Sequence, residues 1–154
     1  MALDILADDL TGEAVLALLA RHLDLMRSTS PPEDVHALDP DSLRAPEVSA
    51  WTAWHDGTLV GCAALKALDD SHGEIKSMHV ASEARGKGVG AALLRHILDE
   101  ASRRSLTRLS LETGSTSHFA PARALYALYG FEYCEPFANY ERSKHSTFMT
   151  RIVA

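Results

Sequence analysis

A glycine-rich stretch between an apolar run and a helical run constrains this chain more than any other feature. Residues 78–94, MHVASEARGKGVGAALL, place three glycines and two basic side chains directly before a sequence with helical periodicity. The N–H groups that open a helix have no partner within it, and the helix dipole adds partial positive charge there. Glycine lets a ligand approach these N–H groups closely. With Arg85 and Lys87, the loop predicts a site for a phosphate or pyrophosphate; the alternative is a turn that binds nothing.

Three phosphate-binding patterns can be compared with this loop. A P-loop needs Ser or Thr after its Gly-Lys pair, but Gly88 follows Gly86-Lys87, so no hydroxyl is available for magnesium. The dinucleotide pattern GxGxxG is not met either, because the three glycines give GxGxG. The pattern that remains, [RQ]xxGx[GA], is met by Arg85, Gly88 and Gly90.

The size and charge of the chain restrict its partners. A length of 154 residues suits one domain with a full core, so we expect a single domain over residues 1–154. The net charge is −6, and residues 1–74 hold 14 acidic and four basic side chains, whereas residues 85–108 hold six basic and two acidic ones. One basic segment in an acidic protein suits a small anionic ligand better than a nucleic acid, which needs a broad basic face.

Cysteine and histidine usage and the N-terminus argue for a cytosolic protein without a metal site. Cys62 and Cys134 are expected to be free thiols, since nothing indicates an oxidising compartment. The N-terminal residues lack the features of a signal peptide, and no run approaches the ~18 apolar residues of a membrane span. The eight histidines are scattered without a metal-binding spacing. We therefore expect a cytoplasmic location, no membrane partner and no metal.

The periodicity of apolar residues predicts a mixed α/β chain. Helices are expected at residues 12–27 with Thr11 as the N-cap, at 91–104 and at 121–129, with a short one from Pro32 or Glu33 to His36. Strands are expected at residues 4–7, 49–55, 58–68, 74–80, 106–113, 131–137 and 146–153. Asp56-Gly57 signals a hairpin turn, and residues 39–48, with two prolines, read as a loop. This order predicts a mixed, mostly antiparallel sheet of about six or seven strands flanked by about four helices.

With these features the chain resembles the GNAT superfamily of N-acetyltransferases, whose pyrophosphate loop for acetyl-CoA has the form [RQ]xxGx[GA]. Residues 122–131, ARALYALYGF, fall about where the family's A-x-x-L-Y-x-x-x-G-F segment falls. The resemblance covers residues 49–137 well. It implies direct acetyl transfer from acetyl-CoA to the amine of a small molecule or peptide, without an acyl-enzyme, and homodimers as a family expectation. The alternative is a non-catalytic acyl-CoA-binding or regulatory module.

The resemblance also implies where the co-substrate binds. The pantetheine arm would lie along the 74–80 strand, with one N–H near its end polarising the thioester carbonyl. The residues implied beside the arm and around the pyrophosphate are Met78, His79, Val80, Arg85, Gly86, Lys87, Gly88, Val89, Gly90 and Ala91.

The implied catalytic groups are a tyrosine and a carboxylate. Tyr126 matches the family tyrosine that protonates the departing thiolate, and the alternative is a residue that only packs in the core. A base is needed because an amine with a pKa near ~10.4 is protonated at pH 7, so exposing the neutral form costs about 4.6 kcal/mol. Glu74 is the first candidate and Glu112 the second, with His79 weaker. The alternative for Glu74 is a solvated carboxylate at a strand end.

The chain departs from the family pattern at one place. Many members have an asparagine that contacts the cofactor three residues before the alanine of the A-x-x-L-Y segment, but Phe119 stands there. Ser117 or His118 is the expected replacement. Residues that could contact the acceptor lie in the irregular region before the first hairpin: Ser30, Glu33, His36 and the loop 39–48. The alternative for them is the capping of surface helices.

Overall fold

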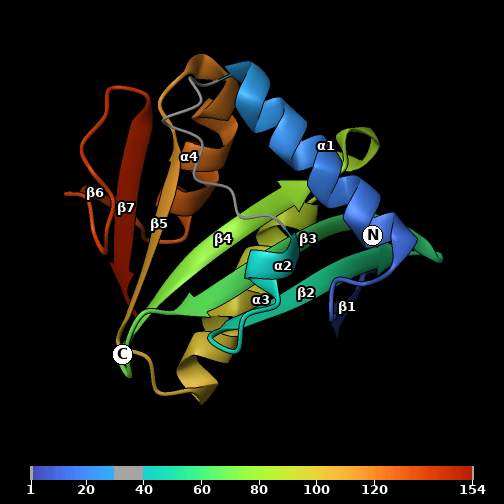
Figure 1. The fold of residues 1–154 in the computed structure, drawn as a ribbon, viewed down its shortest axis with the longest axis horizontal. Coiled ribbons are helices and arrows are strands. Elements are labelled where there is room, and N and C mark those ends of the chain that lie inside the picture. The colour runs from blue at the N-terminus through green and yellow to red at the C-terminus, as the bar shows by residue number, and fades with distance from the viewer. Residues whose placement is uncertain (1, 30–39, 154) are drawn as a thin grey trace.

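The computed structural model describes residues 2–29 and 40–153, which form one seven-stranded sheet with helices on both faces (Figure 1). The strands are β1 (Asp4–Ala7), β2 (Val48–His55), β3 (Thr58–Ala67), β4 (His72–Val80), β5 (Arg108–Gly114), β6 (Glu132–Cys134) and β7 (Ser146–Ile152). The helices are α1 (Glu13–Thr29), α2 (Pro40–Leu43), α3 (Val89–Arg103) and α4 (Ala120–Leu128), with the 3-10 turns η2 (Ser82–Ala84) and η3 (Ser117–Phe119). The predicted mixed, mostly antiparallel fold is confirmed.

The sheet contains one parallel contact, and it divides the strands into two groups. The strand order is β1-β2-β3-β4-β5-β7-β6, and every neighbouring pair is antiparallel except β4 and β5. That pairing runs only from His72 opposite Arg108 to Ile75 opposite Leu111. Figure 1 shows the two strands diverging beyond this point, so the second half of β4 turns away from β5.

The second half of β4 is also irregular along the edge that pairs with β3. Cys62 of β3 pairs with His79, but Ala64 pairs with Lys76, so β4 carries an extra residue where the register shifts. Ser77 in this bulge has a φ of +51°, which is uncommon for a residue with a side chain. Bulges re-aim side chains next to functional sites. The alternating sequence of this strand carried no signal for it.

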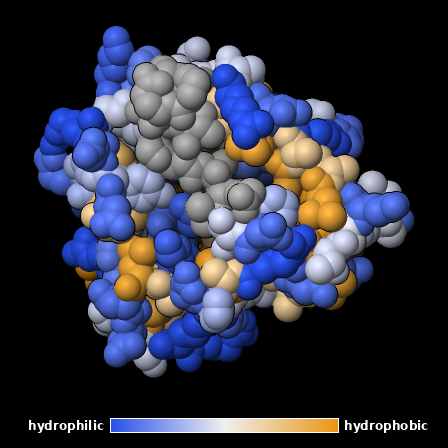
Figure 2. Space-filling view, in the orientation of Figure 1, coloured by the Kyte–Doolittle hydropathy of each residue, from blue (hydrophilic) through white to orange (hydrophobic). Residues whose placement is uncertain are grey.

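Helices α1 and α3 cover opposite faces of the sheet (Figure 1). Apolar residues recur at helical spacing along α3, and its inward side is fully buried at Leu93, Leu94, Ile97 and Ala101. A Cβ on Gly61 of β3 would lie 2.9 Å from Val89 Cγ1 and 3.0 Å from Leu93 Cδ1, so glycine is what lets α3 approach this strand. Hydrophilic side chains cover most of the face drawn in Figure 2, and hydrophobic ones appear there in separate patches.

Several predicted boundaries were wrong, each for a local reason. The expected loop at 39–48 contains α2, which begins at Pro40, because the fixed φ of proline suits the first position of a helix. The expected strand at 131–137 is reduced to β6, since Pro136 lacks the N–H that a ladder needs. Helix α1 begins at Glu13, and the Thr11 hydroxyl donates to Asp9. The short helix expected to end at His36 lies outside the described residues.

Candidate active site

The glycine loop adopts backbone angles that glycine alone takes freely. Gly86 has a φ of +77°, and Gly88, the N-cap of α3, has a φ of +83° in the left-handed region. A Cβ at either position would meet no atom within 4 Å, so the space beside the loop is open. Helix α3 therefore starts at Val89, two residues earlier than predicted, with its first N–H groups at the end of this loop.

A groove of about 390 Å³ runs from the glycine loop along β4 to α4. All the residues predicted to bind the co-substrate line it except Lys87, and Tyr126 lines it too. Helix α1 adds His22 and Leu25, and the α4 side adds His118, Phe119, Pro121, Ala122 and Leu125. The structure thus brings the predicted set together on one surface. Of the two expected replacements for the family asparagine, His118 lines the groove and Ser117 does not.

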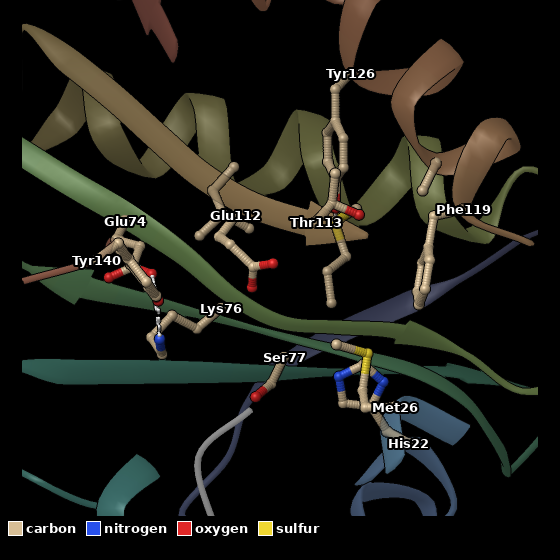
Figure 3. Close-up of a pocket in the computed structure, with 13 residues that line it drawn as sticks. His22, Met26, Glu74, Lys76, Ser77, Glu112, Thr113, Phe119, Tyr126 and Tyr140 are labelled. Atoms are coloured by element: carbon tan, nitrogen blue, oxygen red, sulfur yellow. Dashed lines mark hydrogen bonds and ion pairs between the residues drawn. The ribbon is translucent and has the colours of Figure 1, made fainter. Parts of the chain in front are cut away.

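A second cavity, of about 90 Å³, lies where β4 and β5 diverge (Figure 3). It is lined by residues of both strands and of the segment between β6 and β7: Glu74, Ile75, Lys76, Ser77, Met78, Glu112, Thr113 and Tyr140. It shares five lining residues with the groove, namely His22, Met78, Phe119, Ala122 and Tyr126. The two spaces therefore meet at Tyr126.

Tyr126 is buried at this junction, with 7% of its surface exposed. Its hydroxyl donates to Met78 Sδ at 3.5 Å, and its ring lies edge-on to Phe131. Burial raises the pKa of the phenol, and the negative charge of Glu112 raises it further. The hydroxyl is thus protonated at neutral pH and is a proton donor that faces a sulfur atom.

Glu74 is not the solvated carboxylate that was the alternative for it. It is 3% exposed, and its Oε2 accepts hydrogen bonds from Lys76 Nζ at 3.1 Å and from the Tyr140 hydroxyl. Lys76 Nζ also donates to the Tyr140 oxygen at 2.8 Å. Burial first, and the Glu74 carboxylate second, raise the pKa of Tyr140. These three side chains form a buried polar cluster, called the Glu74 cluster below.

Glu112 lies between the Glu74 cluster and Tyr126 in Figure 3. It is half-buried on β5, and it faces the second cavity beyond the last residue pair that joins β5 to β4. Both predicted carboxylates therefore reach the same cavity, but only Glu74 is held by Lys76.

His22 and His79 form a pair that the sequence did not predict. Their Nδ1 atoms are 3.2 Å apart, so one neutral ring donates to the other across α1 and β4. Burial lowers the pKa of His22 to about 4. Burial first, and His22 second, lower the pKa of His79 to about 3. The sequence did hold a signal that His22 faces the sheet, because His22 lies four residues after Leu18 and four before Met26, which are both on the buried side of α1.

Phe119, at the family's asparagine position, packs on the end of β5. A Cβ on Gly114 would lie 2.0 Å from its Cδ2 atom, so the ring lies directly against the glycine. Arg123 Nη1 donates to the carbonyls of Gly114 and Thr116 at 2.6 and 2.9 Å, which fixes the turn between them. Phe119 is thereby held at the junction of the two spaces.

Metal-binding and membrane-spanning features are both missing from the part of the chain that the structure describes. Within residues 2–29 and 40–153, no three His, Cys, Asp or Glu side chains lie close enough together to hold a metal ion. In the same ranges, none of the helices combines the length and the apolar character needed to cross a membrane. Cys62 and Cys134 are free, as predicted. The candidate acceptor contacts Ser30, Glu33 and His36 lie outside the described residues, and the homodimer and cytoplasmic location stay predictions.

Known proteins resemble this chain over nearly its whole length. Residues 15–131 match the model of the acetyltransferase (GNAT) family. The uncharacterised N-acetyltransferase YsnE of Bacillus subtilis is 52% identical over 144 residues, which are 94% of this chain and 95% of that protein. A crystal structure from Klebsiella pneumoniae, assigned as an acyl-CoA N-acyltransferase, has a TM-score of 0.80 at 29% identity and covers 99% of this chain and 98% of its own.

A third similar protein has a bound ligand. A GNAT acetyltransferase of Elizabethkingia anophelis, solved with acetyl-CoA, has a TM-score of 0.71 at 19% identity over 97% of each chain, and at that identity it shows the shared fold. The family model and the relative in Bacillus subtilis, together with the fold, establish the family. This chain belongs to the GNAT family of acetyltransferases.

Proposed function

We propose that the protein moves the acetyl group of acetyl-CoA directly to a primary amine, with Tyr126 as the general acid and Glu112 as the general base. The observation that carries this proposal is that the groove and the second cavity meet at Tyr126. Two substrates that enter from different sides would place their reacting atoms there. Holding the two reacting groups side by side lowers the activation barrier, because a bimolecular reaction becomes effectively unimolecular.

The groove fits acetyl-CoA by its chemistry. The open glycine loop, the start of α3 and Arg85 would bind the pyrophosphate. Among the described strands, none pairs with the β5-facing edge of β4 beyond Ile75, so the amides of the pantetheine arm could bind that edge as an added strand. The acetyl-CoA bound by the relative from Elizabethkingia anophelis supports this choice of co-substrate.

The reaction then needs two proton transfers at the junction. The neutral amine attacks the thioester carbon, the C–N bond forms, and a backbone N–H near Met78 to Val80 would stabilise the oxyanion. When the C–S bond breaks, Tyr126 would protonate the sulfur. Its hydroxyl already donates to a sulfur atom, that of Met78, so the leaving thiolate would take the place of a similar acceptor.

Glu112 is the better candidate for the base, although the sequence favoured Glu74. Glu74 Oε2 already accepts hydrogen bonds from Lys76 and Tyr140, and protonating it would break a buried ion pair. Glu112 faces the cavity nearer to Tyr126, whose pKa responds to its charge. We therefore assign Glu74 to holding Lys76 in place.

Replacing Tyr126 with phenylalanine tests the acid. Release of CoA thiol should fall about 10²-fold or more in kcat, within the range of general acid catalysis, while the KM for acetyl-CoA changes little. Tyr129→Phe is the matched control, because the Tyr129 hydroxyl accepts a hydrogen bond from Arg95 and Tyr129 lines neither the groove nor the second cavity. A protein that binds CoA by calorimetry but turns over no amine would instead be the non-catalytic module.

Replacing each carboxylate in turn tests the base. Glu112→Gln should lower kcat about 10²-fold or more, because no group then takes the amine proton. Glu74→Gln should lower kcat less than about tenfold, since the amide can still accept from Tyr140. Initial rates across pH 6–9 would compare the two. The reverse order of effects would return the base to Glu74.

A further inference from the structure

We infer that the amine acceptor is a small amino acid, whose carboxylate is bound by the ammonium group of Lys76. This inference rests on the proposed function, and it names the substrate class of the second cavity. It comes from the arrangement of charge along that cavity and from one buried donor that has no acceptor among the described residues.

The second cavity has two chemically different ends (Figure 3). One end, at Tyr126, Met78 and Phe119, is shared with the groove, so the transferred acetyl group and the attacking nitrogen must meet there. The other end is formed by the Glu74 cluster, whose residues line the second cavity and do not line the groove. The cluster is therefore placed to contact the part of the acceptor that lies beyond its amine.

Lys76 has hydrogen-bonding capacity to spare at that end. Only 8% of its side chain is exposed, and its ammonium carries three N–H donors. Two of them reach Glu74 and Tyr140, and no third acceptor lies within hydrogen-bond range among the described residues. A buried charged donor without a partner is unfavourable, and an oxygen of a bound ligand would satisfy it.

The charges along the cavity match a zwitterion. Glu74 and Lys76 compensate each other as a pair, and Glu112 lies between that pair and Tyr126. An acceptor that enters as the common ionic form of an amino acid would place its ammonium by Glu112, which takes the proton, and its carboxylate by Lys76. Hydrogen bonds between two charged groups are stronger than neutral ones.

Other acceptors suit this cavity less well. A plain alkylamine leaves the third Lys76 donor unused, and a diamine brings a second cation towards it. A peptide amino terminus offers an amide where the carboxylate would bind. The volume of about 90 Å³ favours an acceptor of few atoms. In the reaction, Glu112 takes one proton from the ammonium, the C–N bond forms, the C–S bond breaks and Tyr126 protonates the sulfur. The second proton of the attacking nitrogen restores the Tyr126 hydroxyl and Glu112 returns its proton to solvent, so the products are an N-acetyl amino acid and CoA.

Matched acceptors test the inference. Initial rates of CoA release would be measured for each small amino acid, its carboxamide and its decarboxylated amine, for example alanine, alaninamide and ethylamine. For the best amino acid, kcat/KM should be at least about tenfold higher than for its carboxamide and its amine, as expected when one hydrogen bond between charged groups is lost. Equal or higher values for the amine would overturn the inference.

Variants then assign the preference to Lys76. The pair Lys76→Met with Glu74→Gln removes both charges and keeps an acceptor for Tyr140, so it avoids a lone buried carboxylate. The ratio of kcat/KM between amino acid and amine should fall to near one. Lys66→Met on β3, which lines neither space, should keep the wild-type ratio, and calorimetric CoA affinity would check the fold of each variant.

The outcomes separate the two proposals. If amines without a carboxylate are turned over as well as amino acids, the acetyltransferase stands and the amino acid class is wrong. An unchanged ratio in the Lys76 and Glu74 variant would also refute the role of Lys76. If CoA binds but no amine of any class is turned over, both proposals fail together.

Discussion

Phe119 and Gly114 are two residues that must be considered together. The phenylalanine ring occupies the volume that any side chain at Gly114 would need, and the same ring borders both the groove and the second cavity. The absence of the family's asparagine therefore has a structural counterpart five residues earlier. An aromatic ring stands at the junction in place of the family's polar side chain. Gly114, at the end of β5, has no side chain and so leaves room for this ring.

This pairing predicts a non-additive effect on stability. Gly114→Ala should lower the free energy of unfolding by about 1–3 kcal/mol, because its Cβ overlaps the ring of Phe119. In Gly114→Ala combined with Phe119→Ala, the loss should be smaller than the sum of the two single losses, since the overlap is gone. Urea unfolding of the four proteins measures this cycle, and additive losses would show that the ring does not press on Gly114.

At the scale of elements, the His22–His79 pair joins α1 to β4 beside the groove. Both rings are neutral at neutral pH, because burial lowers their pKa values to about 4 and about 3. Arg85 and Arg21 also disfavour a charge on His79. Protonating both rings would replace their hydrogen bond with repulsion between two cations.

The pair makes stability depend on pH in a defined direction. Below the ordinary histidine pKa of 6.5 the two rings bind protons in the unfolded chain but not in the folded one. Stability is therefore fully present above pH 6.5 and falls as the pH drops towards 4 for His22 and towards 3 for His79. A pKa that differs by one between the folded and unfolded states corresponds to about 1.4 kcal/mol, so His22 alone should account for on the order of 3 kcal/mol. Urea unfolding at several pH values would show a flatter profile in His22→Gln with His79→Gln, whereas exposed His118→Gln should keep the wild-type slope.

The elements that the sequence predicted are those with local signals. Asp56-Gly57 takes positive φ at both residues, as the hairpin requires, and the glycine loop precedes α3 where expected. Tyr126 reaches the groove because one short helix carries it. These features depend on neighbours within a few positions.

What the sequence could not predict depends on distant contacts. Tyr140 binds Glu74 across 66 positions, and His22 meets His79 across 57. The shifted register at Ser77 results from the pairing of β4 with β3, and its alternating residues resemble those of a regular strand. The resemblance to the GNAT family indicated two carboxylates as candidates, and only the fold showed that Lys76 holds one of them.

For the molecule as a whole, a ligand that binds only the folded state raises its stability. CoA at 100 times its Kd should add about 2.7 kcal/mol, which is about 5–10 °C in Tm for a chain of this size. Gly88→Ala and Gly57→Ala share a left-handed φ and open space for a Cβ, so each should lower the Tm without ligand to a similar degree. Only Gly88→Ala should lose most of the rise with CoA in thermal scans, and equal rises would argue against binding at the loop.

The short parallel contact between β4 and β5 has a consequence for the whole sheet. Among the described strands, the backbone ladder between the half with β1 to β4 and the half with β5 to β7 consists of four residue pairs. Both proposed substrates would lie where β4 and β5 separate, acetyl-CoA against β4 and the amine against β5. The bound substrates would thus add contacts between the two halves of the sheet, and releasing the products would remove these contacts again.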